Sequence, residues 1–137
     1  MSLDRRFGTG PDNVTIVQFH PAYSYEDFFE GFRPTPRSDG QVGFELEPGP
    51  MRRLTDRARK HPDRLFVLVV DEINRGNLAK IFGELYFLLE YRDEAIDLMY
   101  SSDKAEPFTL PRTVVIIFHL EARYGLAALE KSLTAGE

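Results

Sequence analysis

The stretch FVLVVDEINRG, residues 66–76, decides the fold of this chain. Five apolar residues run directly into two adjacent carboxylates, Asp71 and Glu72. An apolar run without polar alternation predicts a strand that is covered on both faces, as in a parallel sheet. Side chains at the C-terminal end of such a strand lie where open α/β sheets bind ligands. The two carboxylates are therefore the first candidates for a functional site.

Composition limits the classes of protein to which the chain can belong. Its 137 residues suffice for one ordinary domain, and 42% of them are hydrophobic. The absence of cysteine excludes disulfides and thiolate metal sites, and we expect a cytoplasmic location. We expect neither a membrane span, since no apolar run approaches about 18 residues, nor a secretory signal. The net charge of −5 argues against binding of polyanions by the whole chain.

Strand and helix patterns alternate along the chain. Residues 14–19 and 113–118 are rich in Val and Ile and are expected to be strands, like residues 65–70. A helix of about two turns is expected from Ser24 or Tyr25 to Gly31, and a longer one from residue 51 to the HPD sequence at 61–63. A third is expected from an Asn77 cap through residue 89. This alternation predicts an α/β sandwich with a mainly parallel sheet.

The remaining segments are expected to be connections. RPTPRSDGQ, residues 33–41, contains two prolines and a glycine and is expected to be a loop. VGFELEPGP, residues 42–50, alternates apolar and polar side chains and predicts a short exposed strand. AIDLMY (95–100) and PFTL (107–110) flank a polar stretch and are expected to pair as a β-hairpin. The tail, residues 119–137, holds at most a short helix.

The adjacent carboxylates suit phosphoryl-transfer chemistry. With no His or Cys beside them in the sequence, Asp71 and Glu72 offer the oxygen ligands that Mg²⁺ prefers. One carboxylate can hold the metal, often through water, while the other orients or deprotonates the attacking water. A hydrophobic strand followed by Asp and Glu is the Walker B pattern. The alternative is an ordinary polar turn, because an apolar run followed by DE also arises by chance.

Three segments, in the same order, resemble one family. DEINRGNLAKIFGELYFLLE (71–90) resembles the stretch after Walker B in the McrB family, the AAA+ nucleotide-hydrolysing subunits of modified-cytosine restriction systems. HPDRLFVLVVDEINRGN (61–77) resembles that family's approach to Walker B, and FHPAYSYEDFFEGFRP (19–34) resembles a second signature that precedes it. Together the segments cover about residues 14–118.

The resemblance implies a fold and a division of the chain. The expected fold is a partial AAA+ P-loop NTPase sandwich, with flanking helices, a β-hairpin insertion and the strand at 65–70 in the middle of the sheet. Residues 1–13 would be an N-terminal extension, residues 14–118 the AAA+ core and residues 119–137 a divergent C-terminal tail.

The resemblance also implies roles for individual residues. Asp71 would coordinate Mg²⁺, directly or through water, and Glu72 would polarise the hydrolytic water. Asn74 and Arg75 would lie beside the nucleotide or at a subunit boundary. The implied cofactor is Mg²⁺ with ATP or GTP. The implied partners are other AAA+ subunits in a ring and a McrC-like nuclease subunit.

The second signature contributes four further residues of interest. Two readings stay open for them: a functional role within the family's site, or a structural role in which they fix a strand-to-helix turn by packing and hydrogen bonding. The structural role is the favoured hypothesis. These residues are His20, Tyr23, Tyr25 and Asp27.

The sequence departs from the family at two places. It contains no G-x-x-x-x-G-K-[ST] phosphate loop, whose amides and lysine cradle phosphates. It also continues after residue 117 as FHLEARYGLAALEKSLTAGE rather than as a GTMNTADRS-like segment. We therefore expect the chain to be inactive alone. The alternative is a degenerate, non-catalytic fragment or a module that docks into a ring of complete subunits.

A basic stripe raises a third hypothesis, that of nucleic-acid binding. Arg53, Arg57, Lys60 and Arg64 recur at helical spacing. The net charge is negative and no aromatic residues interleave the stripe, so a solvated helix face is the favoured interpretation. Direct DNA binding is not expected.

Overall fold

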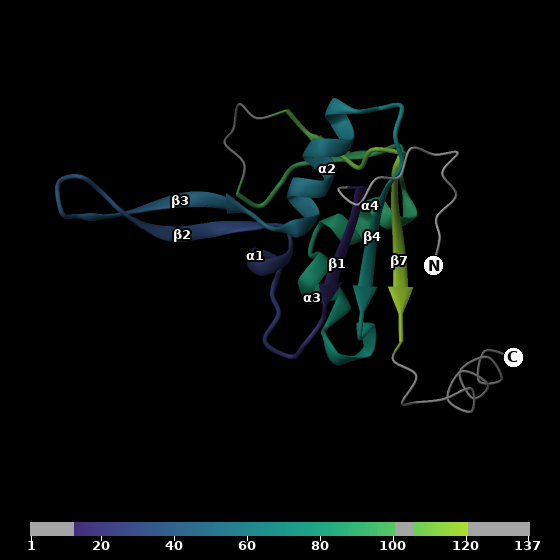
Figure 1. Ribbon diagram of the computed structural model, residues 1–137, viewed down its shortest axis with the longest axis horizontal. Coiled ribbons are helices and arrows are strands. Elements are labelled where there is room, and N and C mark those ends of the chain that lie inside the picture. The colour runs from purple at the N-terminus through teal and green to yellow at the C-terminus, as the bar shows by residue number, and fades with distance from the viewer. Residues whose placement is uncertain (1–12, 101–105, 121–137) are drawn as a thin grey trace, which may run out of the picture.

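The computed structural model describes residues 13–100 and 106–120, and at its centre is a three-stranded parallel sheet. Its strands are β1 (Val14–Gln18), β4 (Phe66–Asp71) and β7 (Val114–His119), in the order β1-β4-β7 (Figure 1). The expected α/β architecture is confirmed. The strand that leads into Asp71 and Glu72, called here the DE pair, also has the expected middle place. Each strand boundary lies within one residue of the expectation, and β4 extends through Asp71 itself.

Four helices supply the core that packs on this sheet. They are the single turn α1 (Tyr25–Phe28), then α2 (Pro50–Lys60), α3 (Leu78–Phe82) and α4 (Leu85–Glu90). Their buried side chains form one cluster with alternate residues of β4 and with one residue each of β1 and β7. Alternate residues of a strand share a face, so this cluster defines the covered face of the sheet. The strand residues in it are Val17, Phe66, Leu68, Val70 and Val114.

The opposite face of the sheet is less covered within the described residues. Ile16 of β1 is 70% exposed and Val115 of β7 is 38% exposed. For the strand expected at 65–70, cover on both faces is confirmed, because Val67 of β4 on this second face is 1% exposed and Val69 is half-buried. The exposed residues of this face belong to the outer strands β1 and β7. The strands β1 and β7 are also the edges of the described sheet.

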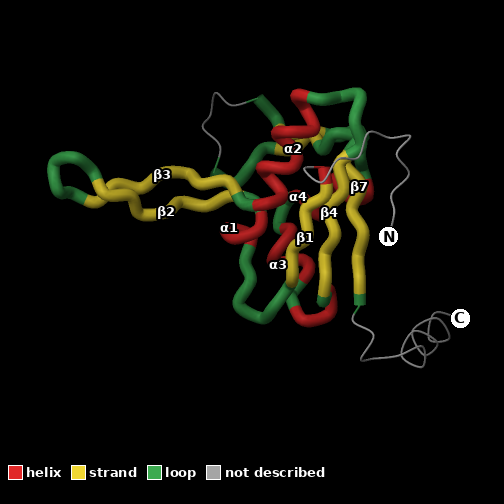
Figure 2. Tube along the Cα trace, viewed as in Figure 1, coloured by secondary structure: helices red, strands yellow, loops and turns green. Residues whose placement is uncertain are grey.

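A long antiparallel hairpin projects from the body beside α1 (Figures 1 and 2). It consists of β2 (Glu30–Pro36) and β3 (Val42–Pro48). The loop expected over residues 33–41 is therefore wrong for 33–36 and confirmed for 37–41, and the short strand expected from residue 42 is confirmed. The amide of Arg37 donates to Gln41 at 2.8 Å, which makes this facing pair a hydrogen-bonded one. Such pairs alternate along the ladder. Pro34 and Pro36 therefore stand where the amide would face away from β3, and no ladder bond is lost.

Two helix expectations also need correction. The helix expected through residue 89 divides at Gly83, whose φ of 53° and ψ of −134° suit glycine alone. A Cβ at this position would lie 3.0 Å from the ring of Tyr25, so the break also lets the chain approach α1 closely. The helix expected up to Gly31 has one turn rather than two, because β2 already begins at Glu30.

The second expected hairpin is confirmed in a reduced form. β5 (Ala95–Ile96) pairs antiparallel with β6 (Phe108–Thr109), and each strand has two residues. Residues 101–105 between them, and the helix expected in the tail, lie outside the described residues. No helix within the described ranges is both long enough and apolar enough to cross a bilayer.

Candidate functional site

The candidate site lies at the C-terminal ends of the three parallel strands, called here the strand-end edge. Asp71, the last residue of β4, pairs in register with Gln18 of β1 and with His119 of β7. The amide of Phe19 donates to the carbonyl of Asp71 at 3.0 Å and fixes the exit of β1 against the tip of β4. The three chain exits are thus gathered around one carboxylate.

Asp71 is held by two donors and remains accessible. Its Oδ1 accepts a hydrogen bond from the amide of Glu72 at 2.9 Å. The same oxygen lies 2.8 Å from Nδ1 of His119. The hydrogen bond with His119 lowers the pKa of the Asp71 carboxyl below its ordinary value. The side chain is 38% exposed, so an ionised, oriented carboxylate faces the strand-end edge.

Glu72 differs from Asp71 in both backbone and environment. Its φ of 56° and ψ of 42° place it in the left-handed region, and it is the one non-glycine residue with positive φ in the described ranges. The residue is 4% exposed, and its Oε2 lies 4.0 Å from Nε of Arg75. Strained backbone of this kind costs about 1–3 kcal/mol and is concentrated at functional sites. An ordinary polar turn does not require a buried, strained carboxylate.

The residues after the DE pair form a turn that leads into α3. Ile73–Arg75 is a short 3-10 turn, η3, on which Asn74 and Arg75 are exposed. Gly76 permits close packing, since a Cβ there would lie 2.6 Å from Cδ1 of Ile81. Asn77 then caps α3 by accepting from the amide of Lys80 at 3.1 Å. Asn74 and Arg75 are thus exposed on the turn that holds Glu72, and their roles stay predictions.

The second signature lies at the exit of β1. Asp27 closes a capping box with Ser24, accepting from its amide at 3.1 Å and from its hydroxyl at 2.9 Å. It also forms a 2.7 Å ion pair with Arg33 of the projecting hairpin. Tyr25 is buried, and its hydroxyl donates to Oε1 of Glu84 at 2.5 Å. Burial raises the pKa of Tyr25 far above its ordinary value.

His20 and Tyr23 occupy the turn before that capping box. The amide of Tyr23 donates to the carbonyl of His20 at 3.0 Å, and their rings lie 5.4 Å apart. Tyr23 also packs on Phe19 with ring centroids 5.6 Å apart, and burial raises its pKa to about 12. His20 is exposed. These contacts lie in a strand-to-helix turn, and the structural role of the four residues stays a prediction.

The donors at the strand-end edge suit one kind of metal site. The described residues hold no group of three or more potential His, Cys, Asp or Glu metal ligands. Mg²⁺ is commonly bound through one or two carboxylates, with water and substrate phosphates completing its shell. Asp71, exposed and ionised beside Glu72, fits that arrangement, with water or phosphate oxygens as the remaining ligands.

His119 is not among the site residues that the sequence predicts. Its contact with Asp71 spans 48 residues of sequence. The signal that could have found it is the parallel register, which sets the last residue of β7 opposite the last residue of β4.

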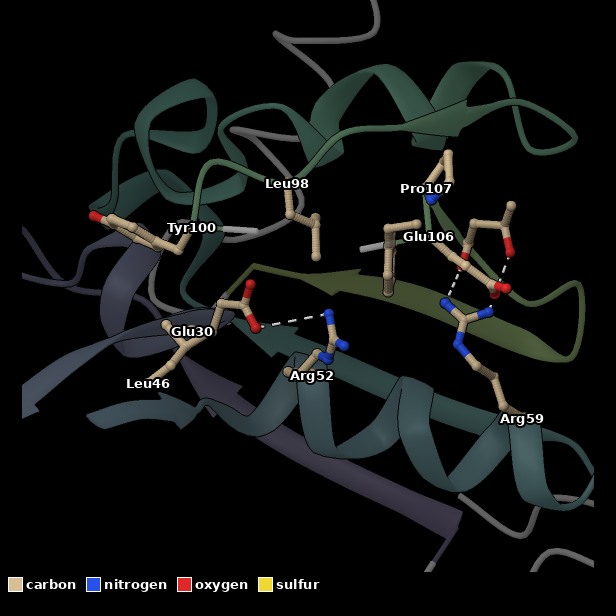
Figure 3. A pocket seen from close by; sticks show the side chains of 10 residues that line it. Glu30, Leu46, Arg52, Arg59, Leu98, Tyr100, Glu106 and Pro107 are labelled. Carbon is tan, nitrogen blue, oxygen red and sulfur yellow. Dashed lines mark hydrogen bonds and ion pairs between the residues drawn. The ribbon is translucent and has the colours of Figure 1, made fainter. Parts of the chain in front are cut away.

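A separate cavity of about 510 Å³ lies between α2 and the segments 98–100 and 106–109, beside the base of the β2–β3 hairpin (Figure 3). In it, Nη1 of Arg52 lies 3.6 Å from Oε2 of Glu30, whose pKa burial raises. Arg59 lies over the ring of Phe108 at 4.7 Å and donates to the carbonyl of Thr109. The ion pair of Arg52 with Glu30 and the contacts of Arg59 with Phe108 and Thr109 all lie within the lining of the cavity. These interactions indicate a structural role for the three charged side chains.

Comparison with known proteins finds one matching family and two curated relatives that share part of their sequence with this chain. The AAA domain (dynein-related subfamily) family matches residues 1–135. The type IV methyl-directed restriction enzyme EcoKMcrB subunit of Escherichia coli K12 is 40% identical over 111 residues, which is 78% of this chain and 23% of that protein. The type II restriction enzyme BsuMI component YdiS of Bacillus subtilis is 28% identical over 105 residues, which is 61% of this chain and 31% of that protein.

The chain thus spans less than a third of the length of either curated relative. A solved structure from Cytophaga hutchinsonii covers 80% of this chain and 26% of its own, with a TM-score of 0.42 at 14% identity, a likeness too distant to carry an argument. The family match extends over nearly the whole sequence, in agreement with the three segments around the DE pair. The chain belongs to the AAA domain family, dynein-related subfamily, and is a McrB-family AAA+ protein.

Proposed function

We propose that this chain carries the residues that bind the metal and activate water in a McrB-like AAA+ NTPase that hydrolyses ATP or GTP. The observation that carries the proposal is the contrast between Asp71 and Glu72 at the tip of the middle parallel strand. The first is exposed and ionised, and the second is buried on a strained backbone. Two carboxylates in different environments are suited to two different roles.

Each residue of the edge has a role in this proposal. Asp71 would hold Mg²⁺ directly or through water, and the metal, when bound, would neutralise negative charge on the nucleotide phosphates. Glu72 would orient and deprotonate the attacking water, with Arg75 beside its carboxylate. Asn74 and Arg75 are exposed on the same turn, where they can face the nucleotide or a neighbouring subunit.

Hydrolysis also needs groups that these 137 residues do not contain. The sequence has no phosphate-loop motif, and removal of even one transition-state donor typically costs about 10²–10³ in rate. We therefore expect the chain to need a phosphate loop carried by additional sequence or by a partner. By name the relatives are a restriction-enzyme subunit and a restriction-enzyme component, which supports partner subunits. Within this proposal the partners are other AAA+ subunits in a ring and a McrC-like nuclease subunit, and the location is cytoplasmic.

Direct DNA binding is not part of this proposal, because much of the basic stripe is engaged within the protein. Arg53 donates to the carbonyl of Pro48 at 2.5 Å, and Arg57 donates to the hydroxyl of Thr15 at 3.3 Å. Arg64 lies beyond the end of α2, so the stripe is shorter than the sequence predicted.

A second candidate function is a non-catalytic docking module, and the projecting hairpin favours it. Its register sets Phe32 opposite Leu46, Pro34 opposite Phe44 and Pro36 opposite Val42. These pairs are two residues apart and share one face. Phe44 is 67% exposed and Val42 is 66% exposed. An apolar face of this kind is typical of a protein contact surface.

The proposal is tested by measuring nucleotide binding and turnover separately in a polypeptide that joins this chain to a phosphate-loop segment. Asp71→Ala should weaken Mg²⁺-dependent nucleotide binding about tenfold or more, because it removes a metal ligand. Glu72→Gln should retain binding and lose turnover. If both variants bind and hydrolyse like the parent, the DE pair is an ordinary turn and the docking module becomes the better account.

A further inference from the structure

We propose that His119 is a positioning residue for Asp71, fixing its carboxylate so that Oδ2 is the oxygen presented to a divalent cation. The inference rests on the proposed function and adds to it a residue that lies outside the DE pair. It also commits to one geometry, in which Asp71 binds the cation through a single oxygen.

The geometry begins with the two strands. Asp71 and His119 are the last residues of β4 and β7 and face each other in the parallel register. Nδ1 of His119 lies 2.8 Å from Oδ1 of Asp71. Nδ1 donates in this contact when it carries a proton, since a carboxylate oxygen accepts only. The pair thus connects two strand ends through one oriented hydrogen bond.

The second donor makes this arrangement directional. The amide of Glu72 donates to the same Oδ1 at 2.9 Å. A carboxylate oxygen has two lone-pair sites, and these two donors occupy those of Oδ1. Oδ2 is the oxygen that neither donor uses. A carboxylate held on one side by a backbone amide and an imidazole has little freedom to rotate, so its other oxygen has a defined direction.

The exposure of the pair argues against a role in stability. The side chains of His119 and Asp71 are 61% and 38% exposed. Ion pairs of this exposure contribute little to folding. Hydrogen bonds to a metal-ligating carboxylate, by contrast, orient the ligand, and their loss typically lowers metal affinity 10- to 100-fold. The expected consequence of His119 is therefore seen in metal binding rather than in stability.

The hydrogen bond itself is tested without any metal. The ¹⁵N spectrum of the imidazoles is recorded at alkaline pH, where free imidazole is neutral, and His119 is assigned by comparison with His119→Asn. We expect its proton on Nδ1 in the parent and on Nε2 in Asp71→Ala. A proton on Nε2 in the parent, or a spectrum unchanged by Asp71→Ala, would overturn the proposal.

The consequence is tested by binding of Mn²⁺ alone, measured by electron paramagnetic resonance. The side-chain amide of Asn reaches the place of Nδ1, whereas that of Gln reaches the place of Nε2. His119→Asn should therefore bind Mn²⁺ like the parent, while His119→Gln and His119→Ala should bind about tenfold more weakly. Asp71→Ala should abolish this binding.

The outcomes separate the two claims. Equal Mn²⁺ affinity in the parent, His119→Gln and His119→Ala overturns the positioning role. If that binding still depends on Asp71, the proposed function stands. Mn²⁺ affinity that is unchanged in Asp71→Ala overturns the metal role of Asp71 and the positioning role together. Circular dichroism of each variant confirms that the exposed substitutions leave the fold intact.

Discussion

The hydroxyl of Tyr25 donates a 2.5 Å hydrogen bond to Oε1 of Glu84 across 59 residues of sequence. The same carboxylate oxygen accepts from the amide of Met99 at 3.1 Å. One carboxylate therefore joins the first residue of α1, the break between α3 and α4, and the chain after β5. This bond gives Tyr25 a structural contact in the fold.

Tyr25→Phe should lower the free energy of unfolding by about 1.5–3 kcal/mol, the range for hydrogen bonds to charged groups. Urea denaturation measures this difference. Tyr86→Phe is the matched control, because Tyr86 is 47% exposed on α4. Equal stability of the two variants would show that the contact with Glu84 contributes nothing to folding.

Replacement of Glu72 by Gly and by Ala isolates the strain at this position. Both variants lose the carboxylate, and they differ in their tolerance of the φ of 56°. Gly normally destabilises relative to Ala, but in the left-handed region the order reverses by about 1–2 kcal/mol. Glu72→Gly should therefore be more stable than Glu72→Ala in thermal unfolding. The ordinary order would mean that the backbone relaxes and stores no strain.

The edge strand β7 should cause self-association of the chain. Within the described residues it pairs only with β4, and Val115 and Phe118 are 38% and 44% exposed. An open apolar edge is a template for pairing with another chain. Sedimentation velocity should show concentration-dependent association that Val115→Lys reduces. Ile116 is a poorer target because it packs against the core. A parent that stays monomeric at high concentration would contradict this prediction.

Alkaline pH should unfold the chain partly through Tyr23. Burial raises the pKa of Tyr23 from 10.0 to about 12, so the folded state keeps a proton that the unfolded state loses first. The stability that follows from this shift is fully present below pH 10 and is lost as the pH rises through about 12. Tyr23→Phe should flatten that part of the stability profile, and Tyr86→Phe should not. Parallel profiles for all three proteins would contradict it.

The fold and the DE pair could be predicted from sequence because they depend on local pattern. The run at Phe66–Asp71 has no polar alternation, and that alone indicates a covered parallel strand. Strand β2 could not be predicted in the same way, because Pro34 and Pro36 ordinarily indicate a break in a strand. Proline lacks the amide hydrogen that a strand residue donates. At Pro34 and Pro36 that hydrogen would face the outer edge of the hairpin, so no hydrogen bond to β3 is lost.

Two other features depend on contacts that no local pattern contains. Leu78 and Leu85 keep a helical period across Gly83, so periodicity alone hides the break. The close approach of Tyr25 reveals it only in three dimensions. His119 likewise becomes a neighbour of Asp71 only once the order and register of the strands are known.

The most direct test of the central claim is the rate of phosphate release from MgATP and MgGTP. It is measured for this chain joined to a phosphate-loop segment, as parent, Glu72→Gln and Glu90→Gln, the last being an exposed glutamate on α4. Glu72→Gln should lower the rate about 10²–10⁴-fold, the usual contribution of a general base, while Glu90→Gln leaves it unchanged. The 137-residue chain by itself should release no phosphate above background. Equal rates in all three joined proteins would contradict the assignment of Glu72 as the residue that activates water.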